Sequence, residues 1–250
     1  MTTSRRPPAA GVLPRALPDL DRGPSEGVTV RVLPVDMLHG GADPARIVRL
    51  VRDGDVAVLA VQEFTPQGEA ALAVAGIGDL LPYRHLSPEP EAGGSGLYSR
   101  HPMLAVSSRR NAGGFQQASA TIQPAGAPAV QVVSVHPLAP AGPDMLAGWA
   151  ADLRDQPPAG GDGPLRILLG DFNATLDHAE LRRLIGTGYR DAADAGLVPS
   201  RPARDGFSGL VTIDHVLADE RIGVRAAEVH TVTDSDHRAV LATLTLPAAG

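Results

Sequence analysis

Ionisable and amide side chains recur in this sequence where runs of apolar residues end or begin. They are Asp36 after VRVLPV, Glu63 after VAVLAVQ, His136 after VQVVSV, Asp171 and Asn173 after RILLG, Asp214 within TIDHVL, and Asp236 and His237 before AVLATL. Strand ends at one edge of a sheet converge in space, and the loops at such an edge commonly carry binding and catalytic residues. We therefore predict that these carboxylates, imidazoles and the amide form a single site.

Four of these pieces, in their order and spacing, resemble the endonuclease/exonuclease/phosphatase superfamily, which includes deoxyribonuclease I and neutral sphingomyelinases. The pieces are Gln62-Glu63, His136, Gly170-Asp171-Phe172-Asn173 and Ser235-Asp236-His237. GDFN combined with SDH at this separation is specific, whereas QE or SDH alone would be weak. The resemblance covers about residues 28 to 247. It implies an α/β fold of two packed β-sheets flanked by helices, a four-layer α/β/β/α sandwich like that of deoxyribonuclease I, with the active site at one end.

The chemistry of phosphate esters explains why these residue types belong together. A phosphodiester carries a charge that repels nucleophiles, so a catalyst must neutralise it, activate water and support the leaving oxygen. By the resemblance, Glu63 is the central metal ligand, Asp36 a second ligand, and Asp236 a third or one that acts through water. Hard oxygen ligands of this kind suit Mg²⁺, with Mn²⁺ as the alternative.

The resemblance also assigns roles to the remaining residues of the set. Asp171 orients and deprotonates the attacking water, and Asn173 donates a hydrogen bond to a non-bridging phosphate oxygen. His237, oriented by Asp214, holds the phosphate as an imidazolium, because a paired carboxylate favours the charged form of histidine. His136 contacts the phosphate or assists the leaving group. The activity implied is that of a divalent-metal-dependent hydrolase of phosphate esters, of the phosphodiesterase, nuclease or phosphatase type.

The sequence departs from the family pattern at the end of the first strand. The family carries asparagine where this chain has Asp36, so an oxygen ligand is kept and a charge is added. Pro34 lacks a backbone donor, so we expect it at a strand end or edge. These changes motivate a second hypothesis, in which the chain is a repurposed member that binds a ligand or partner without hydrolysis, or performs different chemistry.

Composition bears on the substrate. The formal net charge is −6, and all 22 basic residues are arginine, with no lysine. Non-specific binding of duplex DNA relies on neutralising many phosphates, so the acidic balance favours a small phosphate-bearing molecule or a lipid headgroup over duplex DNA. Aromatic residues make up only 3%, so stacking platforms for bases are scarce. Nucleic acid stays open because arginines could form a local basic rim. Arg100 is a candidate phosphate contact, and the other rim candidates are Arg109, Arg110, Arg201 and Arg204.

One catalytic domain accounts for most of the chain. Of 250 residues, 43% are hydrophobic, which is enough for one substantial core. We predict a flexible N-terminal tail over 1–26 and the catalytic domain over 27–250. No cysteine is present, which excludes disulfides and zinc–thiolate sites. No apolar run approaches the length of a membrane span, and the residues after Arg6 do not form the apolar core of a signal peptide. We therefore expect a cytoplasmic protein, acting as a monomer.

The elements that must position the site follow from apolar patterning and turn residues. Apolar-rich segments predict strands at 28–35, 130–135, 166–169, 212–217 and 239–246, and the continuous apolar run VAVLAV predicts a buried strand at 56–61. Asp43-Pro44 and Thr65-Pro66 have the form of helix starts, the first helix ending near Gly54. A helix is also predicted over 144–154, and Asp177 to Glu180 has the form of a capping box for a helix that ends at Gly186. Between 84 and 129, short apolar pieces predict an antiparallel meander.

Overall fold

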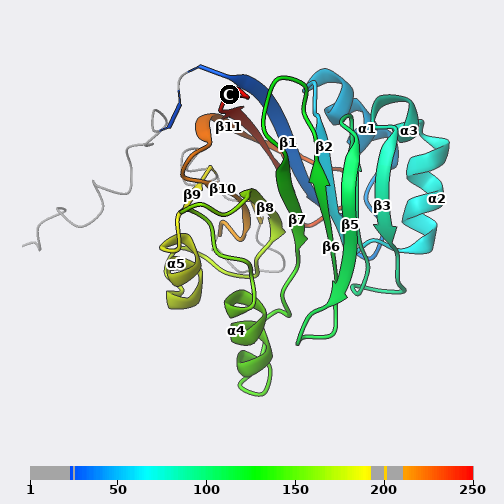
Figure 1. Cartoon of the computed structure of the whole chain (residues 1–250). Helices are drawn as coiled ribbons and strands as arrows, with labels where there is room; N and C mark the ends of the chain where they lie inside the picture. Colours follow the sequence, from blue (N-terminus) through cyan, green and yellow to red (C-terminus); the bar gives the residue numbers. More distant parts are fainter. Residues whose placement is uncertain (1–22, 25, 193–199, 202–210, 250) are drawn as a thin grey trace, which may run out of the picture.

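Two six-stranded mixed sheets form the centre of the protein (Figure 1). The structure is a computed structural model that describes residues 23–24, 26–192, 200–201 and 211–249. The first sheet has the order β11 (Gly223–Thr231), β12 (Arg238–Leu246), β1 (Val28–Asp36), β2 (Val58–Gln62), β4 (Ser95–Ser99), β3 (Tyr83–Ser87). The second has the order β5 (Met103–Arg110), β6 (Gln116–Ile122), β7 (Val130–Val135), β8 (Leu165–Asp171), β10 (Asp214–Asp219), β9 (Tyr189–Asp191). The six predicted strands are confirmed, with ends within two residues of those expected. Most of the predicted tail lies outside the described residues.

Helices cover the outer face of each sheet (Figure 1). The helices α1 (Pro44–Asp53), α2 (Pro66–Val74) and α3 (Ile77–Leu80) lie on the first sheet, and α4 (Leu146–Arg154) and α5 (Ala179–Ile185) on the second. One apolar core fills the space between the sheets, and two others lie between each sheet and its helices. The predicted four-layer sandwich is therefore confirmed. None of the helices in these ranges is long and apolar enough to cross a membrane.

Local sequence explains the first two helix starts. Asp43 caps α1 by accepting a hydrogen bond from the Ala45 amide, and Pro44 occupies the first turn, where no amide donor is needed. Thr65 caps α2 in the same way, accepting from the Gly68 amide. Both predictions are confirmed.

The capping box predicted for α5 is wrong. The N-cap residue is His178, whose side chain makes no capping hydrogen bond. Glu180, expected to reach back to the helix start, instead binds the guanidinium groups of Arg154 on α4 and Arg183 one turn further on. These charged partners provide stronger hydrogen bonds than a backbone amide would.

The sheet topology brings the predicted site residues to one end of the sandwich. The strands β1 and β2 run parallel and end together, with Asp36 opposite Gln62. In the other sheet β7 and β8 run parallel and end together, and β10 begins opposite Asp171 because it is antiparallel to β8. The strand β12, antiparallel to β1, likewise begins at this end.

Two features of the strands differ from the expected pattern. The predicted meander is divided, because β3 and β4 pair in the first sheet whereas β5 and β6 pair in the second. Pro34 lies within β1, opposite Ala60 of β2, but the pairing of β1 with β12 ends at Val32. The proline therefore stands where β1 has a partner strand on one side only, which is how a strand tolerates it.

Candidate active site

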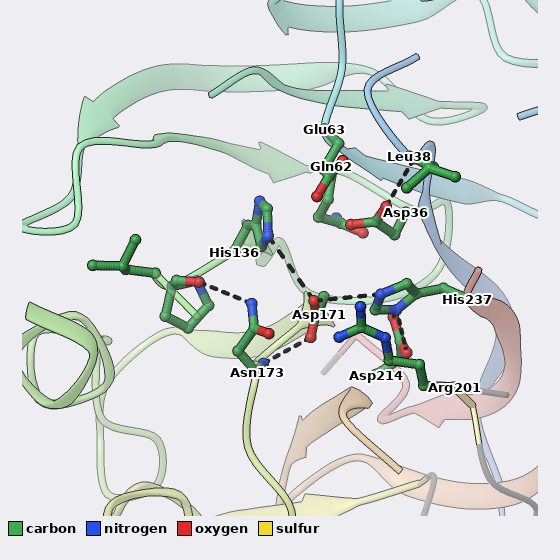
Figure 2. A network of polar contacts seen from close by, with 12 residues as sticks. Asp36, Leu38, Gln62, Glu63, His136, Asp171, Asn173, Arg201, Asp214 and His237 are labelled. Atoms are coloured by element: carbon green, nitrogen blue, oxygen red, sulfur yellow. Dashed lines mark hydrogen bonds and ion pairs between the residues drawn. The ribbon is translucent and has the colours of Figure 1, made fainter. Parts of the chain in front are cut away.

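A cleft of about 370 Å³ opens at the end of the sandwich where these strands meet. Its lining includes Glu63, His136, Asp171, Asn173, Arg201, Asp236 and His237. Asp36 and Asp214 lie beneath them, each only 2% exposed. Figure 2 shows these side chains, Asp236 excepted, pointing toward one another from both sheets. Apart from Arg100, every predicted catalytic residue and metal ligand is therefore brought together here. Of the other rim candidates, Arg201 lines the cleft, Arg109 and Arg110 do not, and Arg204 lies outside the described residues.

The Asp171 carboxylate lies between two imidazole rings (Figure 2). Its Oδ2 is 3.8 Å from Nε2 of His237 and 3.9 Å from Nε2 of His136. Its Oδ1 accepts a hydrogen bond of 2.7 Å from the backbone amide of Asn173. Burial, followed by the nearby charge of Asp214, raises the pKa of Asp171 to about 7. A carboxyl group with a pKa near neutrality is suited to accept a proton during turnover.

Asn173 is positioned by a strained turn. Its φ is +46°, a left-handed conformation that asparagine tolerates better than most residues. The side-chain Nδ2 donates to the carbonyl oxygen of Pro137 at 3.1 Å. An amide nitrogen has two N–H groups, so this bond uses one donor and orients the other.

The two histidines have opposite electrostatic surroundings. Nδ1 of His237 lies 2.9 Å from Oδ2 of Asp214. Burial alone would lower the pKa of this ring, but the Asp214 carboxylate outweighs burial and raises the pKa to about 11. For His136, burial, followed by the charge on His237, lowers the pKa to about 4. Its ring stacks on Phe115, with centroids 4.9 Å apart. At neutral pH, His237 is therefore an imidazolium and His136 a neutral ring.

Two serines hold the strand ends that carry His237 and Asp214. The Ser235 hydroxyl donates to the carbonyl oxygen of Asp36 and accepts from the His237 amide, joining the end of β1 to the start of β12. The Ser200 hydroxyl accepts from the amides of Ile213 and Asp214. The serine of the SDH motif is thus explained by structure, whereas nothing in the sequence singles out Ser200.

The predicted metal ligands form an acidic cluster. Ligand atoms of Asp36, Glu63 and His136 lie within 4.8 Å of one another, and so do those of Asp36, Asp236 and His237. Burial raises the pKa of Asp36 well above its ordinary value, the charge of His237 opposes this, and the Glu63 carboxylate raises it further. Oδ1 of Asp36 accepts from the Leu38 amide, but its buried Oδ2 has no hydrogen-bond partner among the described residues. An unpartnered carboxylate oxygen beside two further carboxylates fits a divalent cation.

The arginine of the site is not the one predicted. The strand β4 runs antiparallel to β2, so its first residue is near the cleft and Arg100, after its last, is at the far end. There the guanidinium binds Asp55 at 2.7 Å and the carbonyl oxygen of Val56. Arg201 lies in the cleft instead, 3.1 Å from Oδ2 of Asp236. Sequence reasoning placed Arg201 only among five rim candidates, because an isolated arginine in a loop carries no distinguishing signal.

Three further residues support the site, Asn111 and Phe115 from the hairpin between β5 and β6 and Asp152 from α4. The Asn111 side chain donates to the carbonyl oxygen of His136 at 2.8 Å. The fully buried Asp152 carboxylate accepts from the amides of Gly113 and Leu138. Phe115 provides the ring stacked on His136. Their sequence neighbourhoods show no motif, so only the tertiary contacts identify them.

The fold and sequence can be compared with those of known proteins. The family model described as Endonuclease/Exonuclease/phosphatase family matches residues 35–237. No curated protein matches the sequence significantly. A solved endonuclease/exonuclease/phosphatase from Beutenbergia cavernae DSM 12333 is 19% identical, with a TM-score of 0.72 over 88% of this chain and 72% of that one.

Two further solved structures share the fold. D. rerio TDP2 complexed with single strand DNA product is 12% identical, with a TM-score of 0.68 over 87% of this chain and 99% of that one. Sphingomyelinase C from Streptomyces griseocarneus is 16% identical, with a TM-score of 0.63 over 86% of this chain and 99% of that one. At these identities the likeness is one of fold.

Proposed function

The chain belongs to the endonuclease/exonuclease/phosphatase family, and on that premise we propose that it is a divalent-metal-dependent hydrolase of phosphate esters. The observation that carries the proposal is the Asp171 carboxylate, placed between a charged and a neutral imidazole and beside an acidic cluster. A water activator, a cationic phosphate ligand and a cation site are the parts that this reaction requires.

Asp36, Glu63 and Asp236 would hold the cation, for which Mg²⁺ is proposed and Mn²⁺ is the alternative. When bound, the cation supplies Lewis-acid chemistry, polarising a phosphoryl oxygen and stabilising the departing one. The surroundings of Asp36 give a physical reason for binding a cation. Burial raises the pKa of Asp36, the charge of His237 opposes this, and the Glu63 and Asp171 carboxylates raise the pKa further, so a cation beside Asp36 would stabilise its charged form.

The other residues act on water and phosphate. Asp171 takes a proton from the attacking water as the new P–O bond forms and the bond to the leaving alcohol breaks. The alkoxide released takes its proton from solvent. His237, kept charged by Asp214, donates from Nε2 to a non-bridging phosphate oxygen. Asn173 donates from its side-chain amide to a non-bridging oxygen as well. His136 is neutral, so it contributes a hydrogen bond to the phosphate or leaving oxygen rather than a full charge.

The substrate we propose is a small phosphate ester or a lipid headgroup, with nucleic acid as the competing class. The net charge of −6 and the single arginine among the described cleft residues support the smaller substrate. That the protein acts as a monomer stays a prediction. The alternative, a member of the family without hydrolytic activity, is motivated by Asp36, but the Asp171, His237 and Asp214 arrangement favours hydrolysis.

The experiment is release of p-nitrophenol from bis(p-nitrophenyl) phosphate, with Mg²⁺, with Mn²⁺ and with chelator. We expect metal-dependent release that disappears in Asp171→Asn. Asp155→Asn, which removes an exposed carboxylate after α4, is the matched control and should keep the activity. Binding of a phosphate ester without release, under all metal conditions, would favour the non-hydrolytic alternative.

A further inference from the structure

One wall of the cleft is made of apolar side chains, which the phosphate chemistry does not use. This apolar wall consists of Ala92, Phe115, Leu138, Ala139, Ala141 and Met145. Most of it comes from two loops, the hairpin between β5 and β6 and the connection from β7 to α4. The charged residues of the lining come from other segments: Glu63 follows β2, Asp236 and His237 precede β12, and Arg201 precedes β10. The cleft therefore has a charged side and an uncharged side.

The apolar wall is open to solvent. Met145 is 37% exposed, and Phe115 and Leu138 are half-buried. Exposed apolar area that lines a cleft is stabilised when a ligand removes it from water. Of the described residues that line the cleft, Arg201 is the only arginine, and it is bound to Asp236. A second phosphate placed on the apolar wall would find no arginine among the described residues of that wall.

The wall is held in place before any ligand arrives. The buried Asp152 carboxylate accepts from the Gly113 amide at 3.0 Å and from the Leu138 amide at 3.1 Å, joining both loops to α4. Asn111 joins the first loop to the second by donating to the carbonyl oxygen of His136. A preformed surface loses little conformational entropy on binding, so the gain from apolar contact is kept.

Resting on the proposed function, we propose that the phosphate ester bound here carries an uncharged apolar group, alkyl or aryl, which lies against the apolar wall. The phosphate occupies the side of Asp171 and His237, and the apolar group extends toward Phe115 and Met145. Such a group, rather than a further nucleotide with its charged phosphate, matches the surface that this side of the cleft presents.

The test is binding of phosphonates, whose carbon–phosphorus bond is not hydrolysed, measured by titration calorimetry with Mg²⁺ present. Methyl-, propyl-, pentyl- and phenylphosphonate form the series, with ribose 5-phosphate and thymidine 5′-phosphate as polar comparators. We expect the Kd to fall by about fourfold per methylene at first, the factor that corresponds to removing one CH₂ group from water. We also expect the heat-capacity change of binding to become more negative along the series.

A matched pair of variants locates the effect. Met145→Ser removes an apolar side chain from the wall, and Leu104→Ser removes one that is 63% exposed on β5, outside the cleft lining. Met145→Ser should flatten the dependence on chain length, whereas Leu104→Ser should leave it as in the parent. Both side chains are exposed, so both variants should fold.

The outcomes separate this inference from the proposed function. Phosphonates that all bind with one Kd, whatever their chain length, overturn the apolar group while leaving the phosphate site intact. Tighter binding of thymidine 5′-phosphate than of pentylphosphonate also overturns it and indicates a nucleotide substrate. If no phosphonate or phosphate binds, the proposed function itself fails, and the inference with it. Aryl binding much tighter than alkyl supports a soluble aromatic ester, and steady tightening with alkyl length supports a lipid.

Discussion

Asp191→Asn should destabilise the protein near neutral pH and have little effect near pH 10. The reason lies in His215, which is fully buried next to the turn that follows β8. Its Nδ1 is 2.6 Å from Oδ2 of Asp191, and its Nε2 is 2.8 Å from the carbonyl oxygen of Ala174. Both partners accept hydrogen bonds, so both ring nitrogens must carry hydrogen and the ring is an imidazolium.

The magnitude follows from the pKa of that ring. Burial alone would lower the pKa of His215, but the Asp191 carboxylate outweighs it and raises the pKa to about 9. An unfolded histidine has a pKa of about 6.5. Because the folded value is the higher one, the stabilisation is complete below about pH 6.5 and is lost as pH rises through about 9. The difference corresponds to about 3 kcal/mol in full, of which about 2 kcal/mol disappears between pH 7 and pH 9.

Asparagine at position 191 suits a neutral ring. Its amide can donate to Nδ1 while Nε2–H keeps the bond to Ala174, so the variant loses the ion pair without leaving a buried group unpaired. Relative to the parent, Asp191→Asn should lose about 2 kcal/mol at pH 7, or about 4–8 °C in Tm, and almost nothing near pH 10.

The assay is urea unfolding of both proteins at several pH values, comparing the difference between them so that other titrating groups cancel. His215→Gln and the double variant complete a cycle, whose coupling free energy should shrink with rising pH. A loss for Asp191→Asn that is the same at pH 7 and pH 10 would refute the charged state assigned to His215.

Four further predictions test the site. Glu63→Ala should weaken Mg²⁺ binding in calorimetry while the fold, followed by circular dichroism, survives; unchanged affinity would remove Glu63 from the ligand set. Asp171→Asn should lower kcat by at least about 100-fold yet leave substrate binding measurable, since only the proton acceptor is lost; a fully active variant would exclude that role. His237→Ala and Asp214→Ala should have similar costs that are far from additive in kcat/KM, because one residue acts through the other; strict additivity would show that Asp214 does not orient His237. Asp36→Asn should loosen Mg²⁺, lower KM for an anionic substrate and leave kcat similar or higher, as one charge near the phosphate is removed; equal Mg²⁺ affinity with all activity lost would instead make Asp36 a catalytic group.

Local patterning accounts for the parts of the fold that were predicted. The strands β1, β7 and β8 are rich in apolar residues, and the burial of most of their positions follows from that hydrophobicity. The strand β11 was not predicted, because half of its residues are only partly buried and its sequence, GVRAAEVHT, has no apolar run. The strand β9 has three residues, too few for any period to show.

The order and spacing of QE, GDFN and SDH were enough to indicate the family, and each motif lies at the end or the start of a strand. What these motifs do not contain is the direction of the neighbouring strands. Arg100 was a reasonable candidate by position, yet antiparallel pairing of β4 with β2 carries it to the far end of the sheet. Arg201 lies in the cleft instead.

Protonation states belong to the tertiary structure in the same way. His136 and His237 are the same residue type at two strand ends, and their sequences do not distinguish them. The carboxylate of Asp214 raises the pKa of one ring to about 11, while burial without such a partner lowers that of the other to about 4. The sequence determined which side chains reach this end of the sandwich, because strand ends are local. Only the fold decided their charges, because burial and the distance to another charge depend on segments that are far apart in the chain.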